Sequence, residues 1–140
     1  MTDPIADRLA VGDVIIKYGT SVDARDLVRY ATCFTDDVVV TGFSGGEQRG
    51  LKPYVEWVAS ALARFSKTQH LIGNQEITVT GDTAYMRSYV QATHVLADDE
   101  TKLLILWGIY VDDLVRTSDG WKIKNHHLIR LIEPRTIQCL

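Results

Sequence analysis

The sequence has few of the features that mark secreted, membrane-spanning or nucleic-acid-binding proteins. Only two cysteines are present, Cys33 and Cys139, and their wide separation indicates neither a disulfide framework nor a cysteine metal site. No apolar run reaches the roughly eighteen residues that a membrane-spanning helix needs. The formal net charge of -3 provides no basic surplus for binding nucleic acid.

The N-terminal segment, from Met1 to Pro4, contains an acid and lacks the charged-then-apolar pattern of a secretory signal. We therefore expect a cytoplasmic protein. The 140 residues suit a single domain spanning residues 1–140, which is long enough to bury a substantial core. No linker, repeat or low-complexity segment interrupts the chain.

Three helices are predicted in the first half of the chain. The pair Asp3-Pro4 is typical of a helix start, since it combines a capping acid with a proline at the first helical position. We expect this first helix to end near Gly19. Its apolar stripe, at helical spacing, consists of Ile5, Leu9, Gly12 and Ile16.

A second, shorter helix and a third helix follow, with Asp23 in the joint between the first two. The second is marked by Leu27, Tyr30, Ala31 and Phe34. Pro53 opens the third, whose apolar stripe consists of Tyr54, Val58, Ala61, Leu62 and Phe65.

The remaining segments have the composition of strands. A β-branched strand over residues 38–43 is followed by a short returning strand near 47–50. Longer strands are predicted over 76–80, 83–95, 102–116 and 121–132, with Pro134 ending the last. This order predicts an α+β fold, a cone-shaped barrel in which the helices pack on a strongly curved antiparallel sheet around an apolar cavity.

His70 is the main candidate for proton chemistry. It lies between the third helix and a strand, where its ring can reach a cavity wall, and histidine exchanges protons near neutral pH. Asp23 is the candidate partner that orients the ring. The alternative for Asp23 is an N-cap of the second helix, and the two roles are compatible because a carboxylate has two oxygens.

Other histidines are weaker candidates. His94 follows an inward strand face made of Ala84, Met86, Ser88, Val90 and Ala92. It is either a hydrogen-bonded core residue or a donor that gives a proton to a carbonyl oxygen or a departing hydroxyl. His126 and His127 are adjacent, so only one can face the cavity. His127 shares a face with Trp121, Ile123 and Ile129 and is the one expected there, although a structural role is the simpler interpretation for both.

A set of mostly apolar and aromatic residues is expected to line the cavity and contact the substrate. This set consists of Tyr54, Trp57, Met86, Val90, Trp107, Tyr110 and His127. The tyrosines with candidate hydroxyl donors are Tyr54, Tyr85, Tyr89 and Tyr110. We expect no metal and no cofactor, because no HxH or HxxxH spacing prearranges metal ligands.

Several segments together resemble the SnoaL-like branch of the nuclear transport factor two superfamily. These segments are residues 18–34, 36–38, 68–73, 81–84, His94, Tyr110 and residues 119–123. Within this branch the chain is similar first to scytalone dehydratase and next to hexachlorocyclohexane dehydrochlorinase. The resemblance implies an aspartate–histidine dyad at Asp23 and His70 and a second pocket histidine at His94. Scytalone dehydratase has a tyrosine just before the dyad aspartate, but Val22 occupies that position here.

The resemblance implies a cofactor-independent lyase that carries out a dehydratase-type elimination on a small cyclic or polyketide-like substrate. Two alternatives remain open: an isomerase or cyclase that uses the same dyad, and a non-catalytic small-ligand-binding domain. The resemblance also implies a homo-oligomer, either a dimer or a trimer.

Overall fold

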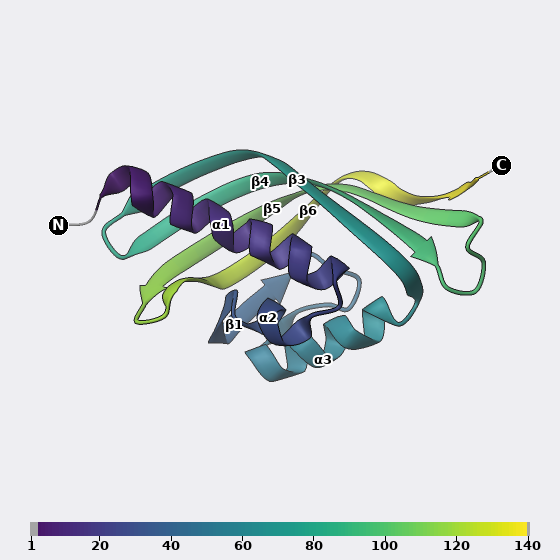
Figure 1. Cartoon of the computed structure of the whole chain (residues 1–140), viewed down its shortest axis with the longest axis horizontal. Helices are drawn as coiled ribbons and strands as arrows, with labels where there is room; N and C mark the ends of the chain where they lie inside the picture. The colour runs from purple at the N-terminus through teal and green to yellow at the C-terminus, as the bar shows by residue number, and fades with distance from the viewer. Residues whose placement is uncertain (1–2, 140) are drawn as a thin grey trace.

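The computed structural model describes residues 3–139, and its three helices pack on one face of a curved six-stranded sheet (Figure 1). Met1 and Thr2, which belong to the N-terminal pattern considered above, lie outside the described residues. The elements, in order, are α1 Pro4–Asp23, α2 Leu27–Ala31, β1 Phe34–Thr41, β2 Gln48–Arg49, α3 Leu51–Leu62, β3 Phe65–Thr80, β4 Thr83–Leu96, β5 Lys102–Thr117 and β6 Gly120–Gln138.

The predicted α+β class is confirmed, but the sheet is mixed and open. Its strand order is β2-β1-β6-β5-β4-β3, so β2 and β3 form the two edges and the cone does not close. The β1–β6 pair is parallel, whereas the other neighbouring strands run antiparallel. Figure 1 shows the long strands β3–β6 arching over α1, with α2 and α3 near the C-terminal half of that helix.

Helix α1 begins as predicted, but it continues past Gly19 to Asp23. The Asp3 carboxylate caps it by accepting a 2.9 Å hydrogen bond from the Ile5 backbone N–H. The helix is apolar on two sides, and the side packed on the sheet is not the predicted stripe. Ile5, Leu9 and Ile16 are exposed, whereas the buried stripe consists of Val11, Val14, Ile15, Tyr18 and Val22. Spacing alone could not choose between two stripes of the same period.

Several element boundaries also differ from the prediction, most of all for β3, which covers residues 65–80 where a strand was expected only over 76–80. Phe34 and Phe65, which were expected to end helices, begin the strands β1 and β3. Strand β6 continues past Pro134 to Gln138. This is tolerated because the β5–β6 register shifts between Ile105 and Trp107, so the proline lies in an irregularity of the ladder where its missing N–H is not needed.

The concave face of the sheet and the helices enclose the core and leave a cavity of about 450 Å³. The predicted inward face of β4 is confirmed, since Ala84, Met86, Ser88, Val90 and Ala92 are all buried. Among residues 3–139, no helix has the length and apolar character needed to cross a bilayer.

Candidate active site

The structure brings Asp23 and His70 into direct contact at the cavity wall. Asp23 is the last residue of α1, and His70 lies on β3, the strand that α1 packs against. The His70 Nδ1 atom is 2.7 Å from Asp23 Oδ1, and the His70 backbone N–H donates a 2.8 Å hydrogen bond to Asp23 Oδ2. The alternative role of Asp23 as an N-cap is wrong, because Asp26 caps α2 by accepting from the Arg29 backbone N–H.

A further chain of hydrogen bonds ends on the same Asp23 oxygen that contacts the His70 ring. Arg25 Nη1 donates to Thr68 Oγ1 over 2.7 Å, and Thr68 Oγ1 is 2.9 Å from Asp23 Oδ1. A guanidinium can only donate, so the Thr68 hydroxyl accepts from Arg25 and uses its own hydrogen for Asp23. Arg25 also donates to the carbonyls of Val22 and Phe65, which fastens the end of α1 to the start of β3.

These donors keep Asp23 ionised. Burial by itself raises the pKa of the Asp23 carboxyl, but the hydrogen bonds from the His70 ring, the His70 backbone and Thr68 outweigh burial and hold the pKa below its ordinary value. An ionised Asp23 requires a hydrogen on Nδ1 of His70. The neutral ring therefore has its bare lone pair on Nε2, and His70 lines the cavity.

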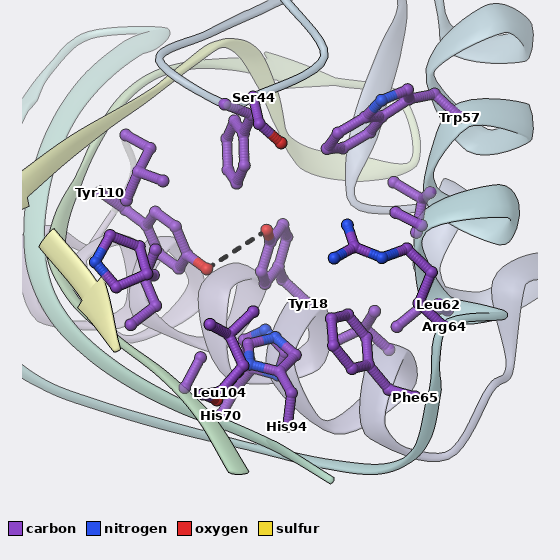
Figure 2. A pocket seen from close by; sticks show the side chains of 18 of the residues that line it. Tyr18, Ser44, Trp57, Leu62, Arg64, Phe65, His70, His94, Leu104 and Tyr110 are labelled. Carbon is purple, nitrogen blue, oxygen red and sulfur yellow. Dashed lines mark hydrogen bonds between the residues drawn. The ribbon is translucent and has the colours of Figure 1, made fainter. Parts of the chain in front are cut away.

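His94 lies beside His70 in the same cavity, with the two ring centroids 5.7 Å apart (Figure 2). Its Nδ1 atom is 3.1 Å from the Leu104 carbonyl oxygen, which can only accept, so Nδ1 holds a hydrogen. Burial lowers the pKa of His94 to about 4, and the ring is neutral at pH 7. Its Nε2 atom is thus an acceptor, which does not fit the predicted role of His94 as a proton donor.

Hydroxyl donors come instead from four buried tyrosines around the cavity: Tyr18, Tyr30, Tyr54 and Tyr110. The Tyr18 and Tyr110 hydroxyls are 3.4 Å apart (Figure 2), and those of Tyr30 and Tyr54 are 2.6 Å apart. Burial raises the pKa of all four phenols, so they remain protonated.

Sequence reasoning found Tyr54 and Tyr110 but missed Tyr18 and Tyr30 as donors. Tyr18 precedes Val22 by four residues, so the two share a helix face, and both line the cavity. This spacing could have shown from the sequence that a tyrosine lies one helical turn before Val22 on the same face. Tyr85 and Tyr89 lie about half exposed on the outer face of the sheet and are wrong as donors.

The predicted substrate contacts divide into two groups. Tyr54, Trp57 and Tyr110 line the cavity as expected. Met86 and Val90 do not line it, because they are buried in the core beside it. Trp107 lies on the outer face, beside Leu71 and Leu131, since the cavity-lining residues of β5 are its even-numbered ones. Because β5 is apolar on both faces, the sequence could not decide which face of the sheet Trp107 lies on.

His127 was also predicted to face the cavity, and this is wrong. The β5–β6 ladder pairs Leu114 with Ile123 but Asp113 with Asn125, so one extra residue of β6 is accommodated there. The bulge reverses the alternation that was read from Trp121 and Ile123. His127 consequently points outward and contacts Thr41, at 2.7 Å from its Nδ1 atom to the hydroxyl.

His126 occupies the inward position instead and forms a second aspartate–histidine pair. Its Nδ1 atom is 2.5 Å from Asp112 Oδ1, and neither side chain is exposed. The imidazole packs behind the cavity wall, with its centroid 4.7 Å from that of Tyr110 and 5.1 Å from that of Tyr18. Because His126 does not line the cavity, this pair supports the tyrosines rather than contacting a ligand.

Exposed charged side chains lie at the mouth of the cavity. Charged residues there are Arg64, Arg130 and Glu133, which together carry one net positive charge. Among residues 3–139, no group of three or more histidine, cysteine, aspartate and glutamate side chains is arranged to hold a metal ion. Cys33 is buried and Cys139 is exposed, and neither forms a disulfide.

Comparison with protein families identifies a SnoaL-like domain over residues 3–127. An uncharacterized protein of Mycobacterium tuberculosis, Rv2910c, is 32% identical over 135 residues, covering 96% of this chain and 88% of the relative. A Novosphingobium aromaticivorans protein that carries the provisional name aromatic ring hydroxylase is 31% identical, with a TM-score of 0.89 over 97% of this chain and 96% of its own.

Two further solved structures share the fold at lower identity. One, provisionally named scytalone dehydratase and also from Novosphingobium aromaticivorans, has a TM-score of 0.85 and 23% identity over 97% of this chain and 89% of its own. The other, a hexachlorocyclohexane dehydrochlorinase from Novosphingobium barchaimii, has a TM-score of 0.84 and 19% identity over 95% and 91%. A Nostoc punctiforme protein described as having a cystatin-like fold also matches, with a TM-score of 0.76 and 22% identity over 91% of this chain and 93% of its own, which supports the predicted cystatin-like architecture.

Proposed function

Because this chain belongs to the SnoaL-like family, we propose that it is a cofactor-independent lyase acting on a small cyclic or polyketide-like substrate. The observation that carries the proposal is the 2.7 Å contact between Asp23 and His70 at the wall of an apolar cavity. Such a pair is a general base whose ring is held in one tautomer by a permanently charged partner.

In the proposed reaction, His70 Nε2 removes a proton from a carbon next to a carbonyl group. The C–H bonding pair becomes the new carbon–carbon double bond as the neighbouring C–O bond breaks. Asp23 stabilises the imidazolium that forms, because its charge lies against Nδ1–H. The imidazolium then returns its proton to the departing hydroxide, so the products are the alkene and one water.

The remaining polar groups of the cavity orient the substrate. The Tyr18 hydroxyl donates to that of Tyr110, so the Tyr110 hydrogen is free to bind the carbonyl oxygen and stabilise the negative charge that develops on it. His94, as an acceptor, receives a hydrogen bond from a substrate hydroxyl. This role replaces proton donation by His94 in our proposal.

A second candidate is an isomerase or cyclase that uses the same dyad and returns the proton to carbon. A third is a binding domain that holds a small apolar ligand without reaction. The ordered donors on Asp23 favour the enzymes, because a simple apolar binding site has no use for a charge-stabilised imidazole.

The experiment is a screen of small cyclic ketols and polyketide intermediates, with product mass measured for the native protein and for His70→Gln. We expect the native protein to release a product lighter by one water and His70→Gln to lose about two to four orders of magnitude in kcat. His127→Gln, which changes an exposed histidine outside the cavity, is the matched control and should remain active.

Product of unchanged mass would favour the isomerase or cyclase. Full activity in His70→Gln would refute the dyad mechanism, and binding of ligands without turnover would favour the third candidate.

A further inference from the structure

Arg64 is a cation at the cavity that the proposed reaction does not use. Arg64 lies between α3 and β3 and lines the cavity together with the apolar side chains of Leu62 and Phe65. Figure 2 shows its guanidinium extending into the cavity, between Trp57 and Phe65 and toward Tyr18. It is therefore directed at the space that a ligand would fill.

No acid neutralises this guanidinium within the part of the chain that the structure describes. The ion pairs among residues 3–139 involve other cations, and Arg64 forms no side-chain hydrogen bond there. Its contact is with the Phe65 ring, whose centroid lies 5.4 Å from the guanidinium carbon. Glu133, a carboxylate that lines the same cavity, forms no ion pair with Arg64.

Consecutive contacts connect Arg64 to the dyad. The guanidinium lies over Phe65, the Phe65 ring centroid is 4.6 Å from that of His94, and the His94 centroid is 5.7 Å from that of His70. A ligand that spans the cavity from its mouth can therefore reach Arg64 with one end while its other end lies against the two imidazoles.

We propose that the substrate carries a carboxylate, which Arg64 binds at the cavity mouth while the cyclic part of the molecule lies against the dyad. A guanidinium presents parallel N–H donors that match the two oxygens of a carboxylate. Arg130, also at the mouth, adds a second positive charge against the single acid Glu133. The apolar wall then excludes water from the rest of the ligand.

This inference rests on the proposed function for the position of the reacting end, but its test needs no turnover. The probes are 1-naphthoate and 1-naphthamide, which have nearly the same shape and differ in charge. Their dissociation constants are measured by calorimetry at neutral pH and low salt for the native protein, Arg64→Gln, Arg64→Lys and His70→Gln. Arg8→Gln removes the same charge from α1, outside this cavity, and is the control.

We expect the native protein to bind naphthoate about tenfold more tightly than naphthamide. Arg64→Gln should abolish this preference, and Arg64→Lys should keep part of it because the charge remains. Arg8→Gln and His70→Gln should retain it. A preference that survives in Arg64→Gln, equal affinity of the native protein for both probes, or binding of neither at millimolar concentration would each overturn the proposal.

The outcomes separate this inference from the lyase proposal. The protein could prefer naphthoate through Arg64 and yet eliminate water from none of the ketols. That result would refute the proposed reaction and support the anion site. Elimination of water from neutral ketols, with equal affinity for naphthoate and naphthamide, would support the proposed reaction and refute the anion site.

Discussion

Thr68 adds a third hydrogen bond to the ionised Asp23 carboxylate, besides the two from His70. Its hydroxyl must accept from Arg25, so its single hydrogen is directed at Asp23. Hydrogen bonds to charged groups contribute about 1.5–3 kcal/mol. Thr68, which reaches the reacting ring through Asp23, thereby helps to keep the carboxylate ionised and the imidazole in one tautomer.

Replacing Thr68 by valine removes this donor and leaves an arginine N–H against a methyl group. We predict that Thr68→Val raises the pKa of Asp23, because a hydrogen bond to the ionised form is lost, and lowers kcat about tenfold to a hundredfold. Carbon-detected NMR titration of the Asp23 carboxyl measures the pKa without any substrate.

Thr68→Ser keeps the hydroxyl and is the matched control. An Asp23 pKa that is the same in Thr68→Val, Thr68→Ser and the native protein would show that Thr68 only fills space.

The lowered pKa of His94 makes the free energy of unfolding depend on pH. Burial lowers its pKa from 6.5 to about 4, so the folded state binds this proton less readily than the unfolded chain does. The stabilisation is fully present above pH 6.5 and is lost as the pH falls from 6.5 to 4. We expect the loss from this group to be roughly 3 kcal/mol in the free energy of unfolding.

Urea unfolding of the native protein and of His94→Gln across this window measures the effect. The variant should lose correspondingly less stability on acidification, whereas His127→Gln should follow the native curve. Parallel curves for native protein and His94→Gln would contradict the assignment.

At the scale of elements, the inward face of β4 could be predicted, but those of β5 and part of β6 could not, because β5 is apolar on both faces. Strict alternation holds along β4, and the buried set Ala84 to Ala92 follows it. On β6 a bulge reverses the alternation before His126, and no residue in that segment signals it. The helix–strand contact that joins Asp23 to His70 was inferred through family resemblance, since local spacing carries no information about residues 47 apart.

The same bulge creates the buried Asp112–His126 pair that joins β5 to β6. Removing one member of a fully buried pair leaves the other as a buried polar or charged group without a partner. This typically lowers the free energy of unfolding by about 3–5 kcal/mol. We therefore predict that Asp112→Ala lowers the free energy of unfolding by about that amount, measured by urea denaturation.

Asp113→Ala, on the exposed side of the same strand, is the control and should cost far less. Replacing Asp112 and His126 together by leucine should recover much of the loss, because an apolar pair leaves no isolated polar group. Equal effects of Asp112→Ala and Asp113→Ala would mean that the pair contributes little.

At the scale of the whole molecule, the outer face of the sheet has an apolar region that no helix covers. It surrounds a shallow depression lined by Leu71, Tyr89, Trp107 and Leu131. Leu71 is 67% exposed and Leu131 is 52% exposed. Contiguous apolar surface of this kind is usually buried against another protein.

We predict that the protein forms a homo-oligomer, a dimer or a trimer, through this outer face. Light scattering after size-exclusion chromatography should give a mass two or three times that of one chain, and Leu71→Glu with Leu131→Glu should give a monomer. Val28→Glu places the same acid at an 83% exposed position on α2 and should leave the assembly intact.

The dyad lies on the opposite, concave side of the sheet, so the monomeric variant should keep the contact between Asp23 and His70 and still bind ligands in the cavity. A native protein that is monomeric at high concentration would contradict the oligomer, and loss of ligand binding in a folded monomer would instead show that a second copy completes the cavity.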